Sequence, residues 1–352
     1  MILKSKDIAK ILNVSPSTVS LAINNKPGVS AETKNKVYAV LEEFYASGNF
    51  APDNWQNGDK SEEKEKDGSD IKGNIVLVIH KAEKQLFIPN TFFQGVIDGC
   101  QSAAMLNNYI LKITYFNTGM SNNMLLDSLS EENVAGVVLY ATEIPYEDIK
   151  MYKELKKPVV ILDARHPFDD MDMITIANRN SIEKAVLYAY EMGHRKIGFL
   201  RSHTVIRNFE DRYEGYMSGL RLVGLEFNEK YVFTVHCSLK GAQSDFLEIL
   251  ETPKEELPTI FLTDLDYNVA GALSAIKKKG YSVPDDFSLI GFDDIDLISE
   301  LDPPLTTIQI KDYFGAIAIN RLVDKIEKND CMHLNIEVST ELLIRESVKR
   351  ID

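Results

Sequence analysis

The sequence predicts two folded units of different class: a small all-α unit at the amino terminus, followed by an α/β core of two doubly wound parallel-sheet subdomains. Three observations predict this division. Apolar residues recur at helical spacing in the first 50 residues, a charged segment without aromatic residues follows, and short runs rich in Val, Ile and Leu then alternate with amphipathic stretches. With 352 residues, 44% of them hydrophobic, the chain is long enough for two or three units with their own cores.

The first 47 residues predict three helices. Ser15 is a candidate N-cap with Pro16 at the first helical position, the turn "KPGVS" follows, and Ser30 begins the third helix. Two short helices joined by a turn and supported by a third form the helix-turn-helix plan, whose second helix enters the major groove of DNA. The residues expected to face inward are Ile8, Ile11, Leu12, Val19, Ala22, Ile23, Val37, Val40, Leu41 and Phe44.

Residues 7–37 read "DIAKILNVSPSTVSLAINNKPGVSAETKNKV". This stretch resembles the amino-terminal pattern of the lactose/galactose repressor (LacI/GalR) family, "DVAxxAGVSxxTVSRVLN…VSxxTxxxV", with its spacings kept. Leu21 stands where members often carry Arg, so base reading is expected to depend on Pro16, Ser17 and Thr18, with Leu21 touching a thymine methyl. The full set of expected DNA contacts is Lys6, Ser15, Pro16, Ser17, Thr18, Ser20, Leu21, Asn24 and Lys36.

The rest of the chain predicts buried strands alternating with helices. Strands are expected at "GNIVLVIH", "AGVVLY", "KPVVILDA", "HRKIGFL", "PTIFLTD" and "FSLIGFDD", and helices at "NTFFQGVIDGCQSAAMLNNY" and "NRNSIEKAVLYAYEMG". Fully apolar runs of this kind are typical of parallel sheets covered by helices. Ligands of such sheets bind at the carboxyl ends of the strands, so two facing subdomains predict a cleft there.

The core also resembles the effector-binding core of the same regulators, which is similar to periplasmic sugar-binding proteins. The motifs that carry the resemblance are "PVVILDARHP", "EMGHRKIGFL", "DRYEGYMSGLRLVGL", "TDLDYNVAGALSAIKKKGYSVPDDFSLIGFDD", "PPLTTI" and "LLIRES". The resemblance implies an effector site that includes Phe92, Phe93, Asp163, Arg165, Arg212, Thr263, Asp264 and Asp293. A strand-end Asp is also common as a cap or turn residue, and one of the two Phe is as well explained by the core. Thr263 stands where family members often have Asn, and Ala177 stands where they often have Asp. Both differences put in doubt that the ligand is an ordinary hexose.

The expected domain boundaries follow these patterns. The helix-turn-helix domain covers 1–47, a flexible linker covers 48–72, and the core covers 73–352, with subdomain 1 at 73–177 plus 308–331 and subdomain 2 at 178–307 plus 332–352. The chain is expected to cross between subdomains near Ile176, Thr307 and Cys331. Family members usually have a hinge helix resembling "NxxARxLR" in the linker. This linker has no such pattern and carries a net charge of −2 from Asp59 to Lys72 (four Lys, six acids), so we expect no hinge helix.

Composition limits the function classes. The net charge of −14 excludes a basic nucleic-acid coat, although residues 1–50 carry a local +2 (six Lys, four acids). The three cysteines have no metal-type spacing and are expected to be reduced, and no signal peptide or membrane span is apparent. No nucleotide-binding, metalloprotease or hydrolase motif occurs, so we expect no catalytic residues, metal or cofactor.

The expected function is that of a cytoplasmic, homodimeric transcription regulator. It would bind pseudo-palindromic double-stranded operator DNA and respond to a small-molecule effector, a sugar or sugar derivative, as a repressor of carbohydrate-use genes. Two alternatives stay open: a solute-binding protein without a DNA function, and a regulator controlled by a protein partner rather than a sugar.

Overall fold

The computed structural model describes the core almost completely and a few positions before it. The described residues are 71–81, 91–117, 121–166, 170–311 and 313–351, together with ten positions between Ala9 and Lys36. The chain divides into two compact units, residues 1–66 and 67–352. The expected linker, 48–72, lies outside the described residues except for its last two positions.

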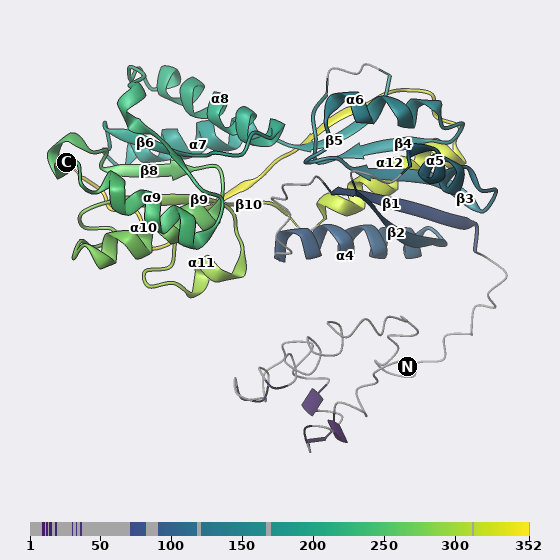
Figure 1. Ribbon diagram of the computed structural model, residues 1–352, viewed down its shortest axis with the longest axis horizontal. Coiled ribbons are helices and arrows are strands. Elements are labelled where there is room, and N and C mark those ends of the chain that lie inside the picture. Colours follow the sequence, from purple (N-terminus) through teal and green to yellow (C-terminus); the bar gives the residue numbers. More distant parts are fainter. Residues whose placement is uncertain are drawn as a thin grey trace. The chain divides into compact units, whose positions relative to one another are not determined.

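Subdomain 1 of the core is built on a six-stranded sheet in the order β11-β5-β4-β3-β1-β2 (Figure 1). All of its pairings are parallel. Its elements are β1 (Gly73–Lys81), α4 (Thr91–Leu106), β2 (Tyr109–Asn117), α5 (Asn122–Ser130), β3 (Val134–Tyr140), α6 (Tyr146–Ile149), η2 (Lys150–Glu154), β4 (Val159–Leu162), β5 (Asp172–Ile176), α12 (Phe314–Glu327) and β11 (Asn335–Val338).

Subdomain 2 repeats the plan with the order β12-β10-β9-β8-β6-β7. Only the pairing of β10 with β12 is antiparallel. Its elements are α7 (Asn178–Glu191), β6 (Ile197–Ser202), α8 (Arg207–Leu222), η3 (Glu229–Tyr231), β7 (Val232–Val235), α9 (Leu239–Ile249), η4 (Lys254–Glu256), β8 (Ile260–Thr263), α10 (Asp266–Lys278), β9 (Ser288–Asp293), α11 (Asp296–Glu300), β10 (Thr306–Gln309) and β12 (Glu341–Leu343).

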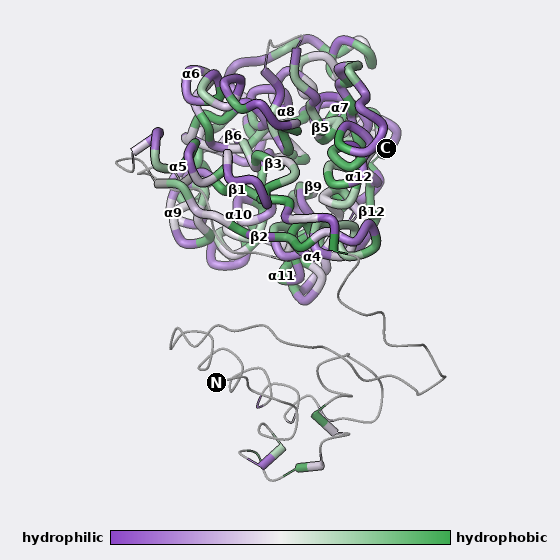
Figure 2. Tube along the Cα trace, turned by 90° about the vertical axis from the view of Figure 1, so that its right-hand side faces the viewer, coloured by the Kyte–Doolittle hydropathy of each residue, from purple (hydrophilic) through white to green (hydrophobic). Residues whose placement is uncertain are grey.

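The central strands form because both of their faces are covered. Every residue of β4, β8 and β9 is buried. Strands that are buried on both faces cannot alternate polar and apolar residues, so they appear as continuous apolar runs in the sequence. Figure 2 shows the hydrophobic segments concentrated in the interior of the core. The six strands expected from such runs are all present as β1, β3, β4, β6, β8 and β9.

The order of the strands determines where a ligand can bind. In subdomain 1, β1 lies between β2 and β3, and in subdomain 2, β6 lies between β7 and β8. At these points the strand order reverses, so the connections leave the sheet on opposite faces and open a crevice at the carboxyl ends of the strands. The two crevices belong to neighbouring subdomains of one compact unit (Figure 1).

The chain crosses between the subdomains three times. The first crossing follows β5 at residue 177, the second lies between β10 and α12, and the third lies between β11 and β12. The expectation of a third crossing at Cys331 was wrong, because β11 pairs in parallel with β5 and so keeps residues 335–338 in subdomain 1. The preceding segment is held there as well, because the backbone N–H of Leu334 donates to the Asp172 carboxylate.

Candidate functional site

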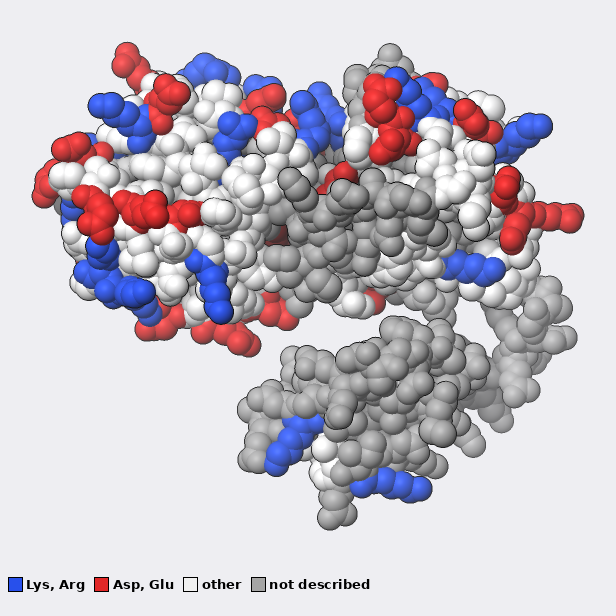
Figure 3. Space-filling model, viewed as in Figure 1, with Lys and Arg blue, Asp and Glu red and all other residues white. Residues whose placement is uncertain are grey.

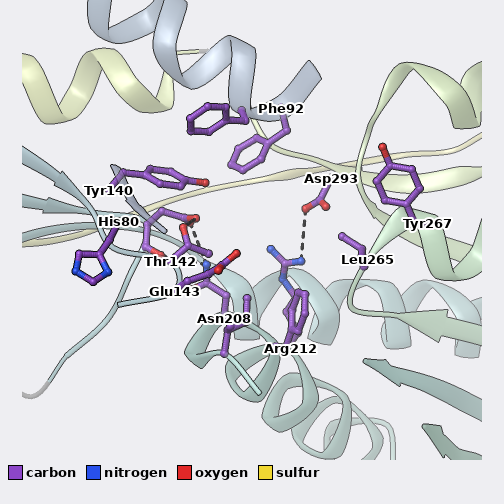
Figure 4. Close-up of a pocket in the computed structure, with 14 residues that line it drawn as sticks. His80, Phe92, Tyr140, Thr142, Glu143, Asn208, Arg212, Leu265, Tyr267 and Asp293 are labelled. Carbon is purple, nitrogen blue, oxygen red and sulfur yellow. Dashed lines mark hydrogen bonds and ion pairs between the residues drawn. The ribbon is translucent and has the colours of Figure 1, made fainter. Parts of the chain in front are cut away.

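A pocket lies where the carboxyl ends of the two sheets meet. It encloses about 750 Å³ of empty space, including the part that opens to solvent. Figure 4 shows side chains from both subdomains around it. Its lining consists of His80, Phe92, Phe93, Tyr140, Thr142, Glu143, Asp163, Ile206, Asn208, Phe209, Arg212, Leu265, Tyr267 and Asp293.

Asp163 directly follows β4 and faces subdomain 2. Its backbone φ is 65°, a left-handed conformation that a non-glycine residue rarely adopts and that is often found at functional sites. One carboxylate oxygen accepts from the Thr142 hydroxyl, and the other accepts from Asn208 Nδ2 at 3.0 Å. Because Asn208 belongs to α8, this bond joins the two subdomains across the pocket.

Asp293 and Arg212 form the subdomain 2 side of the pocket. Asp293 is the last residue of β9, with φ 115°, and its Oδ1 lies 3.4 Å from Arg212 Nη1. Arg212 Nη1 also donates to the carbonyl of Asp264, and the guanidinium carbon lies 3.5 Å from the centre of the Phe292 ring. Arg212 and Asp293 are 4% and 7% exposed, so the pair is almost fully withdrawn from water.

A continuous chain of hydrogen bonds links the two acids. Arg212 Nε donates to Asn178 Oδ1 at 2.8 Å, and Asn178 Nδ2 donates to Asn208 Oδ1 at 3.2 Å. Asn208 in turn donates to both the side chain and the carbonyl of Asp163. Asn178 begins α7 immediately after the first crossing, so the chain of bonds passes the hinge itself.

Close packing of α8 against α7 fixes the position of Arg212. Gly215 and Gly219 lie on α8, three and seven residues beyond it. A Cβ at Gly215 would lie 2.5 Å from the carbonyl oxygen of Arg179, and a Cβ at Gly219 would lie 2.8 Å from Val186. Only glycine permits this approach, so the two glycines hold α8, and with it Arg212, close to the start of α7.

Aromatic rings form the apolar part of the pocket. Phe92 and Phe93 lie at the start of α4, and Figure 4 shows Phe92 above Arg212 and Asp293. Phe93 belongs to the buried core and packs edge-on against Tyr140 with ring centres 5.2 Å apart. Phe92 is only partly buried, so of the two it offers more ring surface to a ligand.

Burial raises the pKa values of several acidic groups around the pocket. Desolvation raises the pKa of Asp163, and it raises the pKa of Asp293 to about 7 although Arg212 acts in the opposite direction. The pKa of Tyr140 is also raised, first by burial and then by the charge of Asp163. Perturbed groups of opposite subdomains that converge on a cavity are a common mark of a binding site.

Three residues expected at the site lie elsewhere. Arg165 is exposed and lies 3.7 Å from Glu337. Thr263 is fully buried and donates to the carbonyl of Leu200 at 3.0 Å. Asp264 is also buried, and its carboxylate accepts from the backbone N–H and the hydroxyl of Ser202. It therefore connects the ends of β8 and β6 and does not line the pocket. Its pKa is raised to about 6, mainly by burial.

Several lining residues were not expected from the sequence. Two of them could have been, because ligands bind at the carboxyl ends of parallel strands. His80 and Tyr140 each end one of the apolar runs quoted above, on the strands β1 and β3 that flank the switch point. Asn208 precedes Arg212 by one helical turn on α8, a spacing that also signals a shared face. Ala177, whose identity suggested an altered cleft, precedes α7 and does not line the pocket; neither does Thr263.

At the amino terminus, the described residues include two helix caps. The Ser15 hydroxyl accepts from the backbone N–H of Thr18 at 3.0 Å, and the Ser30 hydroxyl accepts from that of Thr33 at 3.2 Å. These bonds confirm the N-cap expected at Ser15 and the helix start at Ser30. Of the expected DNA contacts, only Ser15, Thr18 and Lys36 are described; Lys6, Pro16, Ser17, Ser20, Leu21 and Asn24 lie outside the described residues.

The face of the core shown in Figure 3 does not have the charge distribution of a DNA-binding face. On the side shown in Figure 3, the Lys and Arg side chains of the core lie scattered among acidic ones and form no continuous basic stripe. Among the described residues, no helix has both the length and the apolar character that a membrane crossing requires. Nor do His, Cys, Asp and Glu gather there in a group of three or more suited to a metal ion.

Comparison with known proteins identifies both units. Residues 5–50 match the model of bacterial regulatory proteins of the lacI family, and residues 186–348 match a periplasmic binding protein-like domain. The HTH-type transcriptional repressor PurR of Mannheimia succiniciproducens is 29% identical, with 98% of each chain covered. The HTH-type transcriptional repressor CytR of Escherichia coli is 27% identical over 98% of this chain and 96% of that protein. The chain thus combines a LacI family helix-turn-helix domain with a periplasmic-binding-protein-like domain.

Solved structures agree with this assignment at the level of the fold. The transcriptional regulator CelR in complex with cellobiose aligns with a TM-score of 0.69 and 21% identity, covering 97% of this chain and 99% of that one. A LacI family regulator from Enterococcus faecium with bound ribose aligns with a TM-score of 0.67 and 20% identity, covering 79% of this chain and all of that one. The chain therefore has the expected fold, a LacI family helix-turn-helix domain followed by a periplasmic-binding-protein-like core.

Proposed function

We propose that this LacI family regulator is a repressor of carbohydrate-use genes whose effector is a sugar or sugar-like molecule bound between the two core subdomains. The observation that carries the proposal is the convergence of Asp163, Arg212 and Asp293 on one cavity that Phe92 also lines. Carboxylates accept from hydroxyl groups, a guanidinium donates to ring and hydroxyl oxygens, and an aromatic face covers the apolar side of a sugar ring. Neighbours of the same fold hold cellobiose and ribose, which supports this ligand class.

The effector would act through the hinge. Asp163 belongs to subdomain 1, whereas Arg212 and Asp293 belong to subdomain 2, so a ligand that bonds to both sides favours one relative position of the subdomains. A ligand shifts an equilibrium only by its difference in affinity for the two states, and this pocket exists in full only when the subdomains are close. Because the relatives are repressors and regulators, we propose binding and no catalytic step.

The functional unit would be a homodimer in the cytoplasm that presents one recognition helix to each operator half-site. A candidate interface is the outer strand of the first sheet, β2, where Ile110 and Ile113 are exposed, as are Met105 and Leu106 at the end of α4. Exposed apolar residues on an edge strand normally need cover. Sedimentation of Ile110→Asp should show a shift toward monomer, whereas an unchanged dimer would exclude this edge as the interface.

Two measurements test the proposal as a whole. A thermal-shift screen of sugars, sugar phosphates and nucleosides should reveal a ligand that raises the melting temperature, since a ligand at 100 times its Kd stabilises by roughly 2.7 kcal/mol. Operator binding, measured by fluorescence anisotropy, should then change with that ligand. If no small molecule shifts melting while operator binding stays intact, control by a protein partner becomes the better explanation.

DNA reading is tested separately. Thr18→Ala should weaken binding to the operator more than to random DNA, because Thr18 lies in the first turn of the capped helix expected in the major groove. Lys36→Ala should weaken both alike and reduce the salt dependence, as loss of a phosphate contact does. Equal losses on both DNAs for Thr18→Ala would contradict the assigned role.

A further inference from the structure

Two histidines lie side by side at the carboxyl end of the second sheet, outside the effector pocket. His203 follows β6 and His236 follows β7. β6 and β7 pair in parallel with Ser202 opposite Val235, and the backbone N–H of His203 donates to the Val235 carbonyl at 2.9 Å. The two histidines are therefore the next pair in register, and side chains paired in this way leave a parallel sheet on the same face.

The imidazole rings of this pair are close enough to bind one ion together. Their centres lie 4.8 Å apart, and the ring planes are inclined by 46°, so the rings are not stacked face to face. Two imidazoles that bind one tetrahedral zinc ion, each with a Zn–N distance of about 2.0–2.1 Å, have ring centres roughly 5 Å apart. The observed spacing matches that arrangement, and both side chains are exposed, so an ion can reach them from solvent.

Asp245 on α9 fixes the orientation and the tautomer of the His236 ring. Its Oδ2 accepts from the backbone N–H of His236 and from the ring Nδ1, both at 2.7 Å. Because a carboxylate only accepts, Nδ1 carries the proton, and Nε2 presents its lone pair to a metal. Metal-binding histidines are commonly held by a carboxylate in this way, which also makes the ligating nitrogen more basic.

Close packing of α9 holds Asp245 in this position. The Ser238 hydroxyl caps the helix by accepting from the backbone N–H of Gly241 at 3.2 Å. A Cβ at Gly241 would lie 2.5 Å from the Cβ of His236, so only glycine lets the first turn of α9 approach the histidine so closely. The carboxylate is thus in place behind His236 before any ion binds, as a preorganised site requires.

We infer that His203 and His236 form a binding site for a transition metal ion of the Zn²⁺, Ni²⁺ or Cu²⁺ type, with Asp245 as a positioning residue behind His236. Neutral imidazole nitrogens suit these ions, whereas Mg²⁺ and Ca²⁺ prefer oxygen ligands. The described residues contain no group of three or more His, Cys, Asp and Glu suited to a metal ion. Two imidazole ligands leave the remaining coordination positions to water, which favours reversible binding over a permanently held structural ion.

Calorimetry with zinc chloride tests the site in the full-length protein. The measurements use a Cys331→Ser background, because the exposed Cys331 thiol is itself a potential zinc ligand. One Zn²⁺ per chain should bind, and magnesium chloride should give no binding. His203→Ala and His236→Ala should each weaken zinc binding at least about tenfold, and Asp245→Asn should weaken it about 10–100-fold, as loss of a carboxylate behind a ligating histidine does.

His333→Ala is the matched control. His333 is also half-exposed and lies 3.8 Å from a carboxylate, that of Asp172 in subdomain 1, so its loss should leave zinc binding at the pair unchanged. Without metal, His203→Ala should melt at the parent temperature, because the His203 ring is exposed and its bond to Val235 uses only the backbone. Absence of zinc binding in the Cys331→Ser protein, or equal affinity in His203→Ala, would overturn the inference. An equal loss in His333→Ala would also overturn it, because the ion would then bind elsewhere.

Discussion

Two buried Arg–Asp pairs in the described part of the core differ in how their hydrogen bonds and charges are completed. In subdomain 1, Arg321 Nε donates to Asp172 at 2.6 Å, and the same guanidinium bonds to Asp330 and to the carbonyl of Met332. Lys325 adds a second cation 2.5 Å from Asp172. In subdomain 2, Arg212 approaches Asp293 only to 3.4 Å, and of the described residues Asp163 and Asp264 act against it on the pKa of Asp293.

The difference shows what each pair does. The Asp172 pair ties α12, β5 and the segment before β11 into one unit, and its charges are matched locally, as a structural ion pair requires. The Asp293 pair lies against a cavity, and its acid is held in an unfavourable environment that raises its pKa to about 7. Strongly perturbed acids beside a cavity are typical of binding sites, and the proposed effector binding would offset the cost of keeping Asp293 there.

The largest expected effect comes from the structural pair. Arg321→Ala should lower the free energy of unfolding of the core by about 3–5 kcal/mol, because it leaves Asp172 buried with fewer partners. Urea denaturation followed by circular dichroism measures the loss. Lys328→Ala, which breaks an exposed pair with Asp324 on the same helix, should cost under about 0.5 kcal/mol. Equal losses in the two variants would show that the buried pair contributes no more to stability than the exposed one.

The second effect concerns the pocket pair. Arg212→Ala should weaken the effector identified by the screen at least 100-fold, roughly 2.7 kcal/mol, while operator binding in its absence persists. Calorimetry and anisotropy measure the two quantities. Arg201→Ala provides the control, because Arg201 pairs with Glu210 outside the pocket lining. If Arg212→Ala binds the effector with unchanged affinity, the guanidinium does not contribute to effector binding.

These contrasts also show what the sequence could predict. Asp163, Arg212 and Asp293 were expected because their motifs resemble those of the family; Asp163 and Asp293 stand at strand ends, and Arg212 lies within α8. The Asp172 cluster was not foreseen, because its members lie at residues 172, 321, 325 and 330, and only the tertiary fold brings them together. The third crossing was misplaced because β11 is hard to predict. It has four residues, three of them not fully buried, so the sequence shows no apolar run that would indicate a strand there.

The third prediction uses pH. Asp293 has a folded pKa of about 7 against an ordinary value of 3.8, so the folded state binds more protons between these limits. Stability contributed by this group is therefore present at low pH and lost as pH rises toward 7, on the order of 1 kcal/mol per pH unit. Asp293→Asn should flatten the stability profile between pH 5 and pH 7 relative to wild type. Identical profiles would show that Asp293 ionises normally.

The smallest expected effect tests the bond that crosses the pocket. Asn208→Ala removes the donor that joins α8 to Asp163 and should cost about 1–2 kcal/mol of the preference for the closed arrangement. Because Asn208 also accepts from Asn178 next to the first crossing, its loss should loosen the hinge and not only the pocket wall. Small-angle scattering of the ligand-free protein should then show a larger radius of gyration, which saturating effector should restore to the wild-type value. Asn228→Ala, which removes only a local cap at η3 in the same subdomain, should leave the radius unchanged. A radius that does not respond to Asn208→Ala would mean that packing at the crossings, and not this hydrogen bond, holds the subdomains together.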